Sequence, residues 1–302
     1  MAENTLYFGD NLEILRRYIE DESVDLIYLD PPFNSNQAYN VIFEEENGSG
    51  SGAQIQAFDD TWHWTMETAE LYHETVEAGD VRVSETLQAF RNMLGETDMM
   101  AYLANMAPRL VEMRRVLKPT GSIYLHCDPT ASHYLKVLMD GIFGVENYIN
   151  EIVWQRSQPK GHATTRFSSA HDVILFYAKS EDWEFASQHR PHDKDYIERH
   201  YRYVDEETGR RYALDNLLNP NKDRPNLKYE FPPGSGVTRV WRWTKERMME
   251  AWEEGLVVVP PQGEVVRLKR YLDEQQGPLA TDVWDDIEHL HGSSHERLGY
   301  PT

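Results

Sequence analysis

Residues 24–34 read VDLIYLDPPFN, a strand pattern followed directly by a rigid turn. Six mostly apolar residues predict a buried strand that ends at Asp30, and such strands are typical of parallel sheets covered on both faces. Pro31 and Pro32 fix φ and remove two backbone N–H donors, so the turn presents carbonyl acceptors in a fixed geometry.

Strand and helix patterns alternate on both sides of this segment. Apolar residues at helical spacing predict a helix over 11–19 before it and a longer helix from Thr97 to about residue 118 after it. The remaining expected elements are strands at 122–126 and 173–177, a helix opened by Asp128 and a long acidic loop over 34–60. This alternation predicts an α/β domain with a largely parallel sheet.

The turn after the strand carries the groups needed to orient an amino group on a planar base. Such an amine is a poor nucleophile, because its lone pair is delocalised into the ring. The Asp30 carboxylate can accept one N–H and a carbonyl of the Pro31-Pro32 turn the other, which draws the nitrogen toward a tetrahedral geometry. Phe33 offers a ring on which a flipped-out base can stack. The plainer alternative is a proline-rich turn with a capping aspartate.

Asp30-Pro31-Pro32-Phe33 resembles motif IV of the amino-group DNA methyltransferases, in the β arrangement of type III Mod subunits. Further similar segments follow the family order over essentially the whole chain: FGDNLEIL (8–15), GSIYLHCDP (121–129), NYINEIVW (147–154), DVWDDI (282–287) and ERLGYPT (296–302). The resemblance implies a Rossmann-like methyltransferase sheet and S-adenosylmethionine as cofactor. It also implies that the catalytic residues are Asp30, Pro31, Pro32 and Phe33, and that the cofactor contacts Asp10, Asp30, Tyr300, Pro301 and Thr302.

The resemblance also predicts an incomplete sheet. In the family, the Tyr-Pro-Thr segment continues into a helix, a strand and a glycine-bearing loop that holds the methionine end of the cofactor. No glycine loop between a strand and a helix occurs in this sequence, and the glycines at 48–52 lie in an acidic loop. Either the chain is a truncated product, or a second chain or subunit completes the cofactor site.

Composition excludes several classes of protein. Of the 302 residues 40% are hydrophobic and 27% charged, which excludes a disordered chain. No apolar run reaches the ~20 residues of a membrane span, and no signal peptide precedes the first helix, so a cytoplasmic setting is expected. The single cysteine, Cys127, excludes a disulfide framework. No metal site is expected, since His126, Asp128 and His133 lie at a strand end and helix start that favour structural or substrate-loop roles.

The net charge of −21 is unevenly distributed. Residues 1–150 hold 9 Lys and Arg against 25 Asp and Glu, whereas residues 151–250 hold 17 against 16. Basic residues gathered in one region are typical of a DNA-binding surface. Trp241 and Trp243 fit either base stacking or a half-buried strand. The candidate DNA-binding residues are Arg156, Lys160, Arg166, Arg239 and Arg242.

These observations predict three regions: a catalytic α/β region over 1–155, an inserted target-recognition region over 156–275 and a return segment to the cofactor site over 276–302. The expected activity is methylation of adenine N6 in a specific sequence of double-stranded DNA by base flipping, with a restriction subunit as a possible partner. The alternatives are N4-cytosine methylation and a noncatalytic DNA-binding half of a split or truncated methyltransferase.

Overall fold

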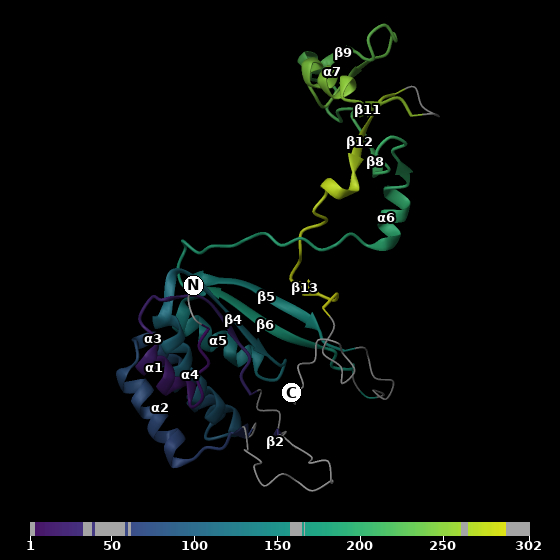
Figure 1. Cartoon of the computed structure of the whole chain (residues 1–302). Helices are drawn as coiled ribbons and strands as arrows, with labels where there is room; N and C mark the ends of the chain where they lie inside the picture. The colour runs from purple at the N-terminus through teal and green to yellow at the C-terminus, as the bar shows by residue number, and fades with distance from the viewer. Residues whose placement is uncertain are drawn as a thin grey trace. The chain divides into compact units, whose positions relative to one another are not determined.

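The structure is a computed structural model that describes residues 4–32, 62–157, 165, 167–260 and 265–287, together with the backbone of 38–39 and 58–59. The chain forms two compact units, one of Met1–Phe185 with Thr281–Thr302 and one of Ala186–Ala280. It leaves the first unit after Phe185 and returns to it at Thr281, as the colours of Figure 1 trace. Each unit is described separately.

The first unit is built on a five-stranded mixed sheet in the order β1-β4-β6-β5-β13. Its strands are β1 (Val24–Leu29), β4 (Leu117–Cys127), β5 (Tyr148–Gln155), β6 (His171–Ala178) and β13 (Val283–Trp284). β1 is parallel to β4 and β13 is parallel to β5, whereas β6 is antiparallel to both of its neighbours. The α/β class is confirmed, and so is the largely parallel sheet, since β1, β4, β5 and β13 run in one direction and β6 runs against them. β6 returns beside β5 through residues 156–170, and antiparallel neighbours need no long crossover connection.

Five helices accompany this sheet: α1 (Asn11–Tyr18), α2 (Met66–Ala78), α3 (Val81–Leu94), α4 (Asp98–Val116) and α5 (Ser132–Phe143). A single 3₁₀ turn, Val145–Asn147, connects α5 to β5. The predicted start of α4 is confirmed, since the Thr97 hydroxyl accepts a hydrogen bond from the Met100 N–H at 3.4 Å. Residues 38–39 and 58–59 form the antiparallel pair β2 (Ala38–Tyr39) and β3 (Phe58–Asp59), and the rest of the expected 34–60 loop lies outside the described residues.

The helix expected to open at Asp128 begins instead at Ser132. The Asp128 carboxylate accepts hydrogen bonds from the N–H groups of Thr130 and Ala131, at 3.1 and 3.0 Å. Asp128 therefore stabilises the turn before the helix, because its side chain reaches backbone donors that precede the first helical turn.

Side chains of the sheet alternate between two faces. On β4, Ile123, Leu125 and Cys127 point into a core formed with helices α2–α5, and Figure 1 shows the helices gathered on one side of the sheet. Tyr124 stacks on Phe176 of β6 on the opposite face, with ring centroids 4.3 Å apart. Because strand side chains have a period of two, Tyr28, Asp30, His126 and Asp172 share that second face, called here the site face.

The second unit combines a small antiparallel sheet with a separate hairpin. The sheet has the order β11-β12-β8-β7, formed by β7 (Tyr203–Val204), β8 (Arg211–Asn216), β11 (Val257–Val258) and β12 (Arg267–Tyr271). The hairpin pairs β9 (Lys228–Glu230) with β10 (Thr238–Val240). Its helices are α6 (Lys194–His200) and α7 (Lys245–Glu253), with 3₁₀ turns at Pro225–Leu227 and Leu272–Glu274.

The limits of this unit differ from the expected region of 156–275. β6 lies inside the first unit's sheet, so the first unit continues to Phe185, and the second unit extends to Ala280. The predicted boundary at residue 156 rested on a change in amino-acid composition after β5. Composition does not show that the next strand, β6, pairs within the same sheet.

Trp241 is the central side chain of the second unit's core. It is fully buried among Phe231, Met248 and Val257, and its indole N–H donates to the Tyr229 carbonyl at 2.9 Å. Of the two alternatives for this residue, base stacking is therefore wrong for Trp241. Trp243, which is partly exposed, lies under the Arg247 guanidinium at 4.3 Å.

We predict that Trp241→Ala destabilises the second unit by about 3–5 kcal/mol, because it leaves a large cavity in the core. Urea unfolding followed by circular dichroism measures the loss. Val204→Ala, at a position that is 56% exposed, is the control and should change stability little. A Trp241→Ala protein as stable as the parent would contradict the packing described.

Candidate active site

Asp30 immediately follows β1, where the strand's parallel partner β4 carries His126. The register pairs Leu29 with Leu125, so the next residues of both strands lie side by side at the carboxyl end of the pair. His126 Nδ1 lies 2.9 Å from Asp30 Oδ1. The Asp30 side chain is 62% exposed and the His126 side chain is only 8% exposed, so a buried imidazole contacts an accessible carboxylate.

A second carboxylate contacts the opposite nitrogen of the same ring. Asp172 of β6, 3% exposed, lies with Oδ2 3.4 Å from His126 Nε2. Its other oxygen lies 3.4 Å from Arg156 Nε. The Trp154 ring packs edge-on against the imidazole at 5.7 Å, and its N–H donates to the Ile287 carbonyl at 2.8 Å. The site therefore draws on the ends of β1, β4, β5 and β6 and on the chain after β13.

The two carboxylates determine the charge of the ring. Burial alone lowers the pKa of His126, but the hydrogen bonds with Asp172 and Asp30 outweigh it and raise the pKa to about 9. The ring is therefore an imidazolium at neutral pH. Burial, together with the nearby Asp30 charge, also raises the pKa of Tyr28 on the same face.

The turn after Asp30 begins inside the described residues. Pro31 is buried and Pro32 partly buried, which fits a rigid turn, whereas Phe33 lies outside the described residues. Cys127, next to His126, faces the core, and burial raises the pKa of its thiol, so the thiolate is disfavoured.

Asp10, the predicted cofactor residue, stands at the start of α1. One carboxylate oxygen accepts from the Leu12 N–H and the other from Arg109 Nη2, both at 2.7 Å. Gly9 before it has φ of 140°, a backbone conformation that favours glycine. The Asp10 side chain is half-exposed and fixed by these two donors, and a carboxylate retains lone pairs for a further donor.

The other predicted residues fall into three groups. Arg156 contacts Asp172, as described above. Arg239 and Arg242 belong to the second unit, where both are exposed and donate to backbone carbonyls of Thr238 and Leu218. Lys160, Arg166, Tyr300, Pro301 and Thr302 lie outside the described residues. Sequence reasoning did not single out Asp172. The signal that could have found it is an acidic residue before the apolar run of β6.

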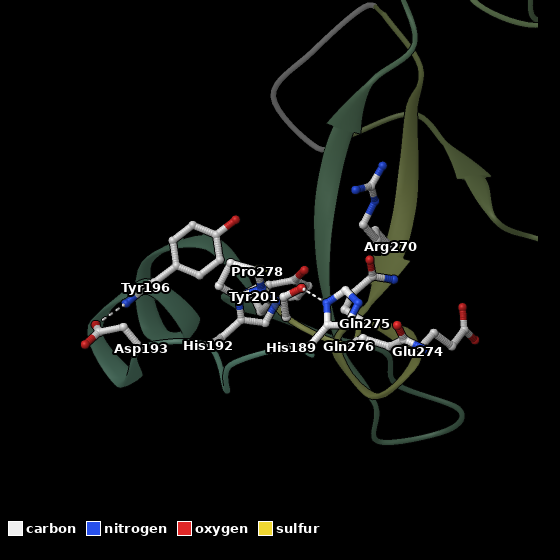
Figure 2. A pocket seen from close by; sticks show the side chains of 11 residues that line it. His189, His192, Asp193, Tyr196, Tyr201, Arg270, Glu274, Gln275, Gln276 and Pro278 are labelled. Carbon is white, nitrogen blue, oxygen red and sulfur yellow. Dashed lines mark hydrogen bonds between the residues drawn. The ribbon is translucent and has the colours of Figure 1, made fainter. Parts of the chain in front are cut away.

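The second unit also contains a cavity of about 780 Å³. Figure 2 shows the side chains that line it, which include His192 and Tyr196 around α6 and Arg270 on β12. The rings of His192 and Tyr196 stack with centroids 5.1 Å apart, and His189 Nδ1 lies 2.9 Å from the Gly277 carbonyl.

The described residues contain no cluster of three or more His, Cys, Asp or Glu side chains arranged to hold a metal ion. No helix in the same part of the chain is long and apolar enough to cross a membrane.

The residues of this site lie within a segment that matches a known protein family. A family model described as "DNA methylase" (N6_N4_Mtase) matches residues 24–302, which include Asp30, His126 and Asp172. The chain belongs to this DNA methylase family.

The chain is also similar to individual proteins. The chain is 25% identical to the type III restriction-modification enzyme StyLTI Mod subunit of Salmonella typhimurium over 95% of its own length and 41% of the relative's. It is 25% identical to the type II methyltransferase M.KpnI of Klebsiella pneumoniae, over 94% of this chain and 63% of that one. A solved structure from Thermus thermophilus, a DNA modification methylase, is 14% identical with a TM-score of 0.31, covering 63% of this chain and 56% of that one. The chain thus spans roughly half the length of these relatives.

The His126 ion pairs predict how stability depends on pH. The folded-state pKa of about 9 exceeds the ordinary 6.5, so the stabilisation is fully present below pH 6.5 and is lost as pH rises through 9. The loss amounts to at most about 3 kcal/mol.

Urea unfolding of the parent, His126→Phe and the control His133→Gln between pH 6 and 10 measures this dependence. Only His126→Phe should lack the decline across that window. A decline of equal size in all three proteins would contradict the assignment.

Proposed function

We propose that the chain carries out S-adenosylmethionine-dependent methylation of adenine N6 in a specific sequence of double-stranded DNA, through base flipping and within a restriction-modification system. The observation that carries the proposal is the accessible Asp30 carboxylate at the carboxyl end of β1, hydrogen-bonded to the buried His126 and followed directly by two prolines. Membership of the DNA methylase family supports it.

In this proposal the turn orients the target amine. Asp30 accepts one N–H and the Pro31 carbonyl accepts the other, which withdraws the nitrogen lone pair from the ring and directs it out of the base plane. Pro32 keeps the turn rigid, because its φ is fixed. Phe33 stacks on the flipped base, so the amine is confined beside Asp30 before reaction.

Carboxylates of the first unit are suited to accept hydrogen bonds from the proposed cofactor. Asp10 is half-exposed and fixed by Leu12 and Arg109, which suits it to accept from hydroxyl or amino donors of the cofactor. Asp30, Tyr300, Pro301 and Thr302 complete the proposed contacts. When bound, S-adenosylmethionine supplies an activated methyl group.

Cytosine N4 is the second candidate target, since the same acceptors can hold that amine. Asp rather than Ser at the first motif position favours adenine, by resemblance to the family. The similarity to Mod subunits of type III restriction-modification enzymes favours a restriction subunit as partner. A noncatalytic DNA-binding half is the remaining alternative, and a second chain would then complete the cofactor site.

We propose that the second unit recognises the DNA sequence. Residues 186–280 hold 16 Lys and Arg against 16 Asp and Glu, so the whole net charge of −21 belongs to the remainder of the chain. Exposed cations on the β9–β10 hairpin and the start of α7 pair with no carboxylate within the described residues: Lys228, Arg239, Arg242, Lys245 and Arg247. Such cations suit contacts with phosphates. Arg156, Lys160 and Arg166 are proposed to contact DNA from the first unit.

Asp30→Ala should lower methyl transfer about 100- to 1,000-fold while DNA binding is retained, because one of two amine acceptors is lost. Transfer of a labelled methyl group to DNA, followed by identification of the modified nucleoside, measures rate and target together. Asp25→Ala, an exposed carboxylate earlier on β1, is the matched control. Undiminished transfer by Asp30→Ala would overturn the mechanism, and N4-methylcytosine would overturn the choice of base.

Arg239→Gln and Arg242→Gln should each weaken DNA binding and lower the slope of log affinity against log salt by about one, because each removes one phosphate contact. Fluorescence anisotropy at several salt concentrations measures both quantities. Arg17→Gln, an exposed arginine in the acidic unit, is the control. Equal salt slopes for all proteins would exclude these arginines from the DNA interface.

A further inference from the structure

The two nitrogens of His126 face two carboxylates on opposite sides. Nδ1 lies 2.9 Å from Asp30 Oδ1, and Nε2 lies 3.4 Å from Asp172 Oδ2. An ionised carboxylate only accepts hydrogen bonds, so both ring nitrogens must carry hydrogen to satisfy this geometry. His126 therefore donates toward Asp30 while it is anchored from behind by Asp172.

The anchor is buried, whereas the carboxylate that His126 contacts is exposed. Asp172 is 3% exposed and is itself paired with Arg156, and the imidazole edge packs against Trp154. Asp30 is 62% exposed, and among the described residues His126 is the side chain that hydrogen-bonds it. An exposed carboxylate without such a donor would sample several rotamers.

We propose that His126 is a positioning residue for the amine acceptor Asp30: it holds Oδ1 of Asp30 so that Oδ2 is presented to the amino group, and Asp172 fixes His126 in that orientation. This inference rests on the proposed role of Asp30 in methyl transfer. Three contacts in series thus connect Arg156 to Asp172, Asp172 to His126, and His126 to Asp30. Asp172 and His126 are buried, and the acceptor Asp30 is exposed.

Charge as well as geometry favours this role. The ring donates to one oxygen of Asp30, and a carboxylate can accept hydrogen bonds through both of its oxygens. Among the described residues, Asp30 after β1 and Asp172 from β6 contact the ring nitrogens, Trp154 from β5 packs against the ring, and Arg156 pairs with Asp172. Asp30 and Asp172 thus lie on opposite sides of the His126 ring, and their hydrogen bonds with it raise the pKa of His126 to about 9 against the effect of burial.

The first test needs no activity. In the 302-residue chain labelled at histidine, nuclear magnetic resonance should show His126 doubly protonated at pH 7.5 and titrating near pH 9. Asp30→Asn and Asp172→Asn should each lower that pKa by about one pH unit or more, as expected for loss of a charged hydrogen-bond partner. A pKa near 6.5 that neither variant changes would overturn the coupling.

The second test asks whether the coupling serves the reaction. His126→Leu should lower the single-turnover rate of methyl transfer about 10- to 100-fold with little change in KM for DNA. His126→Asn, whose amide can donate near the Nδ1 position, should retain more of the rate. The parent rate should decline as pH rises through 9, a limb that His126→Asn should lack because an amide does not titrate. His133→Asn, at an exposed position, is the control, and melting curves verify folding.

The outcomes separate the two proposals. Equal rates and pH profiles for parent and His126→Leu, with Asp30→Ala inactive, would overturn the positioning role and leave the proposed function intact. Full activity of Asp30→Ala would overturn the proposed function, whereas the resonance measurement would still decide whether His126 and Asp30 are coupled. A rate loss in His126→Asn as large as in His126→Leu, without the pH limb in the parent, would indicate a merely structural role.

Discussion

The parallel register of β1 and β4 is the constraint on which the candidate site depends. It pairs Leu29 with Leu125, and so brings Asp30 beside His126 on the site face. A slip of one residue would turn Ile27 and Leu29 out of the core and move Asp30 to the wrong face. The same apolar alternation that fills the core with Ile123 and Leu125 therefore positions the polar groups, and no separate device is needed to align them.

Burial of Asp172 is tolerated because each of its oxygens faces a cation. An isolated carboxylate in that position would cost several kcal/mol, and removal of one partner of a buried pair is strongly destabilising. His126 and Arg156 face its two oxygens from neighbouring strands. The second unit uses the same principle, since Asp205 accepts from Lys269 at 2.7 Å and Tyr271 at 3.0 Å, and these bonds hold the pKa of Asp205 far below its usual value.

Sequence patterns predicted the local elements and not the way the strands combine. The apolar run and Asp30 gave the span Val24–Leu29, and Thr97 marked the start of α4, because both signals are local. The expected burial of that strand is wrong, since Leu26 and Tyr28 are 57% and 56% exposed. Helices α2 and α3 were not anticipated, although Val83, Leu87 and Phe90 of α3 follow helical spacing and are buried. The direction of β6 and the pairing of Asp172 with His126 depend on contacts between strands distant in sequence, which residue patterns do not encode. His126 itself was assigned a structural role, whereas its contacts connect it to the predicted catalytic acid.

The second unit leaves the sheet after β6 and its chain returns as β13, and both of these strands are neighbours of β5. None of the four strand pairings in this sheet involves a residue of 186–280. That segment is therefore an insertion between β6 and β13, the two strands that flank β5. Its length and sequence can change over evolutionary time, or be exchanged by recombination, without shifting any pair of residues in the sheet, so the two units are free to diverge at different speeds.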